Sequence, residues 1–186
     1  NNILKRDIEQ RHNIKYVDAF ERLAHHLMNV APVVVVENEL ANVVGLKSSH
    51  TVNIYIGFLK EAYLLLGLKK YSTKSRLRVR AEKVYPVDVA LMDGRLDAFA
   101  GENIGWRLET LVYLELLRRN RPLGHDIYYY KSAAGYEADF VVCKNNVVQE
   151  IYQVSYDISK DKTRKRELRG LLAASHETGC EHLYLI

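Results

Sequence analysis

The sequence predicts a mixed α/β (α+β) chain made of two modules, a basic helix-rich one followed by one that mixes helices and strands. One observation is the uneven charge: residues 1–88 carry 14 Lys and Arg against 9 Asp and Glu, whereas residues 89–186 carry 13 against 14. The other is the period of the apolar residues, which is helical at first and alternates between helical and strand-like later. We therefore expect modules at 16–88 and 89–186, after a leading segment of residues 1–15.

The first module is predicted to begin with three helices. Their apolar residues recur with helical spacing over 16–29, 37–44 and 49–62. Gly45 ends the second helix, and Ser48 or Ser49 can cap the third. This is the layout of a helix-turn-helix, in which residues near the start of the later helix contact nucleic acid. The contacts expected on that helix are Lys47, His50 and Asn53.

A basic hairpin is expected after the third helix. Strand-like stretches at 63–71 and 83–87 flank a turn at 72–75, which makes the module a winged helix-turn-helix. Cations that alternate with apolar residues project from one face of a strand and suit a phosphate backbone. The wing residues expected to contact double-stranded DNA are Lys74, Arg76, Arg78 and Arg80. The alternatives are a hairpin that is simply solvated and a winged helix that binds protein.

The second module is predicted to have the order α-β-β-β-α-β. Its helices cover 101–120 and 163–178, and its strands cover 127–131, 136–143, 147–156 and 182–186. A hairpin turn is expected at Lys144-Asn145-Asn146, so the second and third strands are antiparallel neighbours.

Candidate site residues lie on the first helix and on these two strands. Glu109 is placed against an apolar helix face, where a carboxylate usually has a partner or a role. Asp139 and the pair Gln153 and Ser155 are expected to face one another across the hairpin. The arrangement resembles the restriction-endonuclease-like nuclease fold, whose motif is an Asp followed, on the next strand, by Glu or Gln-x-Lys.

This resemblance implies a vestigial catalytic site of Glu109, Asp139, Gln153 and Ser155. The Lys that helps to activate the attacking water is replaced by Ser155, and Glu109 and Asp139 would hold Mg²⁺ only weakly. Lys144 or Lys165 standing in for the missing Lys remains an alternative.

A second resemblance covers most of the chain. It rests on short segments in a fixed order, namely Leu40-Ala41-Asn42, Thr51-Val52, Lys83-Val84-Tyr85, Glu109 to Val112, Tyr136 to Val142, Ile151 to Ser155 and Thr163 to Leu168. In these segments the chain resembles the C-terminal region of a prokaryotic family of AAA-type ATPases. The resemblance implies an N-terminal ATPase domain as partner, with residues 1–15 as the tail of its lid or a linker. The chain has no Gly-x-x-x-x-Gly-Lys-Ser/Thr motif, so ATP would bind only in that other domain.

The composition limits the cellular location that we expect for the chain, and three classes of function remain. No apolar run is long enough to cross a membrane, and Cys143 and Cys180 have no metal-like spacing. We expect a cytoplasmic protein with two buried, reduced thiols and no cofactor beyond the weak Mg²⁺ site. The favoured class is a nucleic-acid-binding accessory region of an ATPase. The other two are a protein-interaction or assembly module on a nuclease scaffold and a working metal-dependent nuclease.

Overall fold

The protein is a mixed α+β chain with two sheets, as predicted. The computed structural model describes residues 4, 8–72, 82–94 and 104–186. The chain divides into two compact units, Asn1–Gly67 with Lys83–Asp97 and Leu68–Glu82 with Ala98–Ile186. Tyr71, which the sequence prediction put in 16–88, groups with the second unit because its backbone N–H donates to the carbonyl oxygen of Tyr129 at 2.7 Å.

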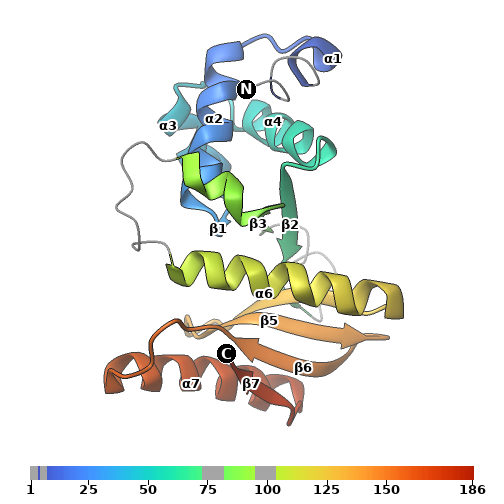
Figure 1. The fold of residues 1–186 in the computed structure, drawn as a ribbon, viewed down its shortest axis with the longest axis vertical. Helices are drawn as coiled ribbons and strands as arrows, with labels where there is room; N and C mark the ends of the chain where they lie inside the picture. Colours follow the sequence, from blue (N-terminus) through green and yellow to red (C-terminus); the bar gives the residue numbers. More distant parts are fainter. Residues whose placement is uncertain (1–3, 5–7, 73–81, 95–103) are drawn as a thin grey trace. The chain divides into compact units, whose positions relative to one another are not determined.

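The described part of the first unit has four α-helices, a short 3-10 helix and a small sheet (Figure 1). Its helices are α1 (Gln10–His12), α2 (Val17–Val30), α3 (Glu37–Val44), α4 (Ser49–Glu61) and η2 (Val89–Gly94). The strands are β1 (Val33–Val34), β2 (Leu65–Lys69) and β3 (Glu82–Pro86), in the order β1-β3-β2. The end of β2 from Leu68 and the first residue of β3, Glu82, are grouped with the second unit. The sequence did not predict β1, whose two residues are too few to show a period.

The turn between α3 and α4 is set by one glycine. Gly45 has a φ of 75°, a left-handed conformation that suits glycine at a helix end. The next N–H, that of Leu46, donates to the carbonyl oxygen of Ala41 at 2.8 Å and closes α3. The chain then enters α4, whose inner face buries Val52, Tyr55, Ile56 and Leu59 against the core of the unit.

The second unit follows the predicted order of helices and strands. Its helices are α6 (Ile104–Asn120), the short η3 (Arg121–Leu123) and α7 (Asp161–Thr178). Its strands are β4 (Asp126–Lys131), β5 (Glu137–Lys144), β6 (Val147–Gln153) and β7 (Leu183–Leu185). They form one sheet in the order β4-β5-β6-β7, with β7 parallel to β6 and the other neighbours antiparallel.

The β5–β6 hairpin has the turn that its sequence predicts. Asn145 and Asn146 have φ angles of 51° and 64°. A two-residue hairpin turn of this kind needs two left-handed residues, and asparagine accepts that conformation more readily than most residues.

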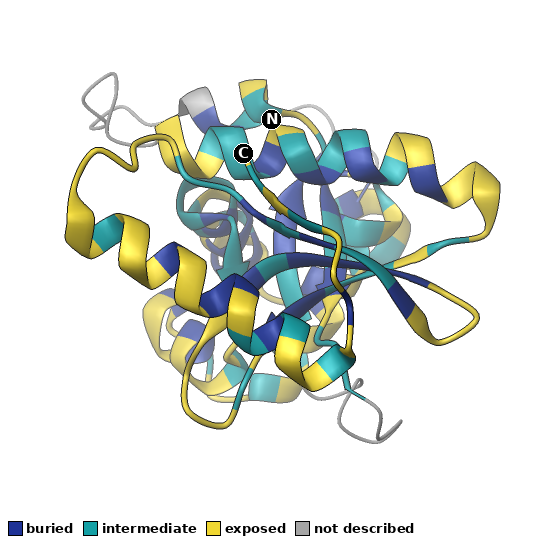
Figure 2. Cartoon of the chain, turned by 90° about the horizontal axis from the view of Figure 1, so that it is seen from below, coloured by how far each residue is buried: buried dark blue, intermediate teal, exposed yellow. Residues whose placement is uncertain are grey.

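The two long helices cover opposite faces of this sheet (Figure 1). Tyr113 of α6 stacks on Phe140 of β5, with ring centroids 5.7 Å apart. On the other face, Gln153 of β6 bonds to Glu167 of α7. The strands between them carry runs of buried residues, drawn dark blue in Figure 2.

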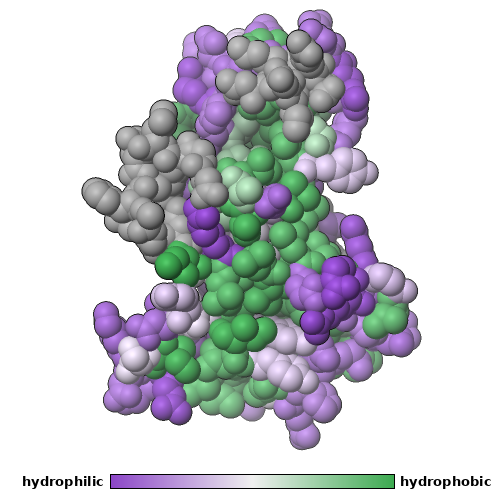
Figure 3. Space-filling model, in the orientation of Figure 1, coloured by the Kyte–Doolittle hydropathy of each residue, from purple (hydrophilic) through white to green (hydrophobic). Residues whose placement is uncertain are grey.

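The buried faces of α6 and α7 do not follow the apolar residues alone. Helical spacing groups Ile104, Leu108, Leu111, Val112 and Leu116 on α6, but Leu111 is 49% exposed and hydrophobic residues show at the surface along α6 in Figure 3. The buried residues of α6 are Thr110, Tyr113, Leu116 and Asn120. Thr110 and Asn120 can be buried because each side chain donates to a carbonyl oxygen of its own helix, at 2.8 and 3.0 Å. On α7, likewise, Leu171 is buried but Leu172 is 61% exposed.

Two composition-based expectations can be compared with the described residues. Cys143 and Cys180 are both free and buried, as predicted, and they belong to the same apolar cluster. None of the described helices combines the length and the apolar character that crossing a bilayer requires.

Candidate functional site

The outer face of α4 carries the residues predicted to contact nucleic acid. Lys47 lies in the turn before α4, and His50 and Asn53 lie in its first two turns. All three are exposed, whereas the inner residues of α4 are buried. A spacing of three residues makes His50 and Asn53 neighbours on the surface of α4, and Lys47 lies just before the N-cap residue, Ser48. The arrangement leaves this side of α4 open to a partner.

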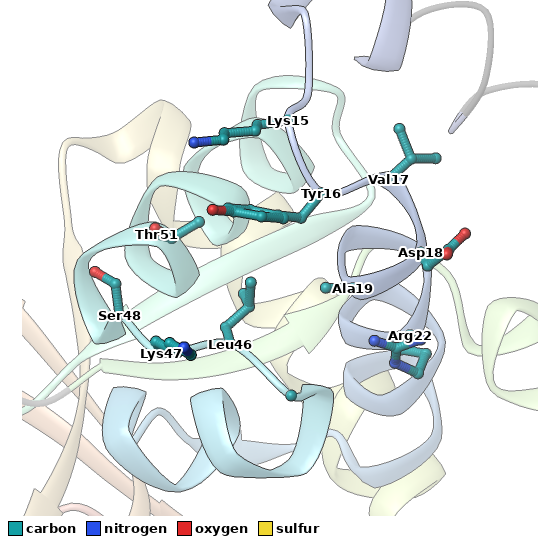
Figure 4. A pocket seen from close by; sticks show the side chains of 11 residues that line it. Lys15, Tyr16, Val17, Asp18, Ala19, Arg22, Leu46, Lys47, Ser48 and Thr51 are labelled. Carbon is teal, nitrogen blue, oxygen red and sulfur yellow. The ribbon is translucent and has the colours of Figure 1, made fainter.

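A pocket of about 690 Å³ lies beside this face, at the α3–α4 turn (Figure 4). Lys15, Arg22 and Lys47 bring three cations to it, and Asp18 is the only carboxylate among the described residues that line it. Two of the cations are held in place: Arg22 Nη2 donates to the carbonyl oxygen of Val44 at 2.9 Å, and Lys15 Nζ lies 5.2 Å from the centre of the Tyr16 ring.

The same pocket is lined by the first residues of two helices, α2 and α4. In the described part of the chain, neither N-cap residue, Tyr16 or Ser48, makes a side-chain capping bond. Both helix starts therefore have first-turn N–H groups available for another acceptor. Helix N-termini and cations together favour an anion such as a phosphate oxygen.

The predicted wing contacts cannot be compared in the same way. Lys74, Arg76, Arg78 and Arg80 lie outside the described residues. Their expected role stays a prediction.

In the second unit, the hairpin brings Asp139 and Gln153 together. Phe140 pairs with Tyr152, so the same register places Asp139 opposite Gln153. Asp139 Oδ2 accepts a 2.8 Å hydrogen bond from the backbone N–H of Val154, just beyond the end of β6. The carboxylate therefore has a structural partner at the point where the two strands end.

Gln153 is tied to α7 by a residue that the sequence analysis did not select. Its Nε2 donates to Glu167 Oε2 at 2.6 Å, and both side chains are buried. Glu167 Oε1 accepts from Arg166 Nε and Nη2 at 3.0 and 2.5 Å. Gln153 Oε1 is also buried and has no hydrogen-bond partner among the described residues. The position of Glu167 on the same helix face as Leu171 and Ala174 was the signal that could have identified it.

Ser155 and Glu109 occupy different surroundings. Ser155 Oγ donates to the carbonyl oxygen of Asp157 at 3.4 Å, a long bond within the loop after β6. Glu109 is half-buried on α6, one turn before Tyr113. Because Tyr113 stacks on Phe140, α6 covers the sheet face opposite the Gln153–Glu167 bond. No group of three potential metal ligands occurs within the described ranges. The convergence of Glu109 with Asp139 and Gln153 in one pocket remains a prediction.

Two of the predicted site residues, Asp139 and Gln153, thus lie opposite each other on paired strands. The chain belongs to the family described as a domain of unknown function, DUF8612, whose model matches residues 1–100. Residues 105–186 match a second domain of unknown function, DUF4143.

The chain is also similar to the uncharacterized protein MJ1544 of Methanocaldococcus jannaschii. The two are 28% identical over 173 residues, which is 90% of this chain and 37% of that protein. This chain therefore spans little more than a third of its relative. No solved structure matches it significantly.

Proposed function

We propose that the chain is a nucleic-acid-binding C-terminal accessory region of an AAA-type ATP-binding protein. The observation that carries this proposal is the start of α4, where His50 and Asn53 are exposed on the helix and Lys47, in the turn before it, lines a cationic pocket. A duplex that meets this side would contact base edges through the helix and backbone phosphates through the pocket.

The proposal treats the first unit as a winged helix-turn-helix. The order α3, tight turn, α4 supports the helix-turn-helix, and β2 and β3, which follow α4 in the chain, would be the wing strands. The hairpin cations Lys74, Arg76, Arg78 and Arg80 would add phosphate contacts. Such contacts release counterions, so binding should weaken steeply as salt is added.

The parent ATPase is proposed from the length of the relative MJ1544 and from the resemblance of the chain to the C-terminal region of AAA-type ATPases. MJ1544 is much longer than the matching region, which leaves room for a further domain in a protein of that kind. ATP would bind in such a domain, since this chain has no phosphate-binding loop motif. The two free, buried cysteines agree with a cytoplasmic setting.

We further propose that the second unit keeps a nuclease-like scaffold without nuclease activity. Gln153 is engaged with Glu167, and Ser155 supplies a hydroxyl where the nuclease motif has an amine. A hydroxyl offers no positive charge to help activate a water molecule, although Glu109 and Asp139 could hold Mg²⁺ weakly. We expect no Mg²⁺- or Mn²⁺-dependent cleavage of DNA or RNA. Metal-dependent nicking that disappears in Asp139→Ala would overturn this part.

Binding is tested by fluorescence anisotropy with a random-sequence duplex at two salt concentrations. The double variant Lys47→Gln, His50→Ala should bind more weakly, and loss of the Lys47 contact should lower the log–log salt slope by roughly one unit. Asn53→Ala should change any preference among sequences. The matched control is Lys144→Gln, His182→Ala, which removes the same residue types from exposed positions of the other unit. If the wild-type chain binds no duplex even at low salt, the nucleic-acid function is wrong, and the assembly-module alternative takes its place.

A further inference from the structure

The second unit has a pocket of its own along the first half of α7. Its volume is about 560 Å³, within the range of small-molecule sites. The residues that line it are Tyr136, Lys162, Thr163, Lys165, Arg166 and Arg169. Four of the six are cations and none is an acid, so the pocket has a strongly positive lining.

The four cations crowd one side of the helix. Lys162 and Arg166 are four residues apart, and so are Lys165 and Arg169. Lys165 also follows Lys162 by three residues, and Arg169 follows Arg166 by three. Like charges at these spacings destabilise a helix by roughly 0.2–0.5 kcal/mol per pair. Within residues 104–186, Lys162, Lys165 and Arg169 form no ion pair that would offset the repulsion. Ion pairing within the described residues therefore does not account for this cluster.

Arg166 is the one cation of the four that is fixed by a carboxylate. Both of its bonds go to Glu167 Oε1, and Glu167 is itself held from inside by Gln153. Because Glu167 is buried and the Arg166 side chain is 77% exposed, the guanidinium is oriented at the surface with donors to spare. Glu137, at the start of β5, is paired with Lys131. A guanidinium held in this way can donate to a phosphate with little loss of conformational entropy.

We infer that this pocket binds the adjoining phosphate groups of a nucleotide, with Arg166 as the fixed donor and Lys162, Lys165 and Arg169 neutralising the remaining charge. Cations at successive turns of one helix match a ligand with several charges close together better than a single phosphate. Tyr136, which is 44% exposed, adds an aromatic ring at the pocket for a base. This site is separate from the duplex contact proposed for α4.

The test uses a fluorescent ATP analogue as the probe, with anisotropy as the readout, at low salt and without added metal. The key variant is Lys165→Gln, Arg169→Gln. The matched control is Lys160→Gln, Arg164→Gln, which removes one lysine and one arginine from exposed positions that do not line the pocket. We expect the key variant to bind at least about tenfold more weakly, since hydrogen bonds to charged groups are lost, and the control to bind as the wild type does. Far-UV circular dichroism checks that both variants fold.

Competition identifies the source of the phosphates. Unlabelled pyrophosphate should displace the probe, while inorganic phosphate should do so only at much higher concentration. If a single-stranded oligonucleotide binds with the same dependence on Lys165 and Arg169 but the ATP analogue does not, the nucleotide is the wrong ligand and a polynucleotide backbone takes its place. If neither ligand binds at low salt, or if both double variants weaken binding equally, the inference is overturned.

Discussion

Substitution of Gly170 with alanine should destabilise the second unit, although alanine is the better helix former. A Cβ atom at Gly170 would lie 1.8 Å from the backbone carbonyl oxygen of Glu137. An ordinary contact between carbon and oxygen is about 3.3 Å, so α7 would have to move away from β5 by roughly 1.5 Å. The obstacle is backbone and cannot turn aside as a side chain could.

The size of the effect follows from two opposing contributions. Forcing an extra carbon into a packed contact costs about 1–3 kcal/mol, and the rigid obstacle favours the upper end of that range. Replacing glycine by alanine inside a helix returns about 1 kcal/mol. We therefore expect the free energy of unfolding to fall by about 2 kcal/mol.

Urea unfolding followed by tryptophan fluorescence measures this directly, because Trp106 is the only tryptophan of the chain and lies in the second unit. The control is Gly105→Ala on α6, where an added Cβ meets nothing within 4 Å. That variant should be as stable as the wild type or slightly more stable. A Gly170→Ala protein that matched the wild type or exceeded it would refute the close contact between α7 and β5.

Three further changes test the polar contacts of the second unit. Gln153→Glu should place a second carboxylate against Glu167 and lower the free energy of unfolding near neutral pH by about 3 kcal/mol. The urea midpoint should recover at mildly acidic pH, where one of the two carboxyls is protonated, and a midpoint independent of pH would contradict this. Asp139→Ala should cost about 1–3 kcal/mol, because the backbone N–H after Gln153 loses its charged acceptor, and Asp139→Asn should cost less. The hydrogen bonds that Arg118 and Arg119 donate to Glu115 lower the pKa of that carboxyl to about 2. Because this pKa is depressed, the ionised Glu115 contributes stability above the ordinary carboxyl range, and this stability is lost as the pH falls towards about 2. Glu115→Gln should therefore flatten that part of the acid unfolding curve. A Glu115 carboxyl that titrates in the usual range by NMR would show the lowered pKa to be wrong.

Local chemistry in the sequence was enough to place most of the helices and strands. Apolar residues at helical spacing, followed by a glycine that accepts a left-handed conformation at position 45, give the bounds of α3. The pair Asn145-Asn146 gives the β5–β6 hairpin. Both features depend on residues close together in the chain, which is why the sequence alone could predict them. The register shift between Val142 and Cys143, which sets Asp139 opposite Gln153, was not predicted.

Only the tertiary structure decided which side of each helix is buried and what the buried polar residues contact. The face of α6 is chosen by Tyr113 stacking on Phe140, and the face of α7 by the closeness of Gly170 to β5 and by the Gln153–Glu167 bond. Leucines on both helices remain at the surface as a result, and Glu167 becomes the partner that secures Arg166 at the rim of the basic pocket. A helix with apolar residues on more than one side can pack in several orientations, and the surface it packs against comes from distant parts of the chain, so no local pattern specifies the choice.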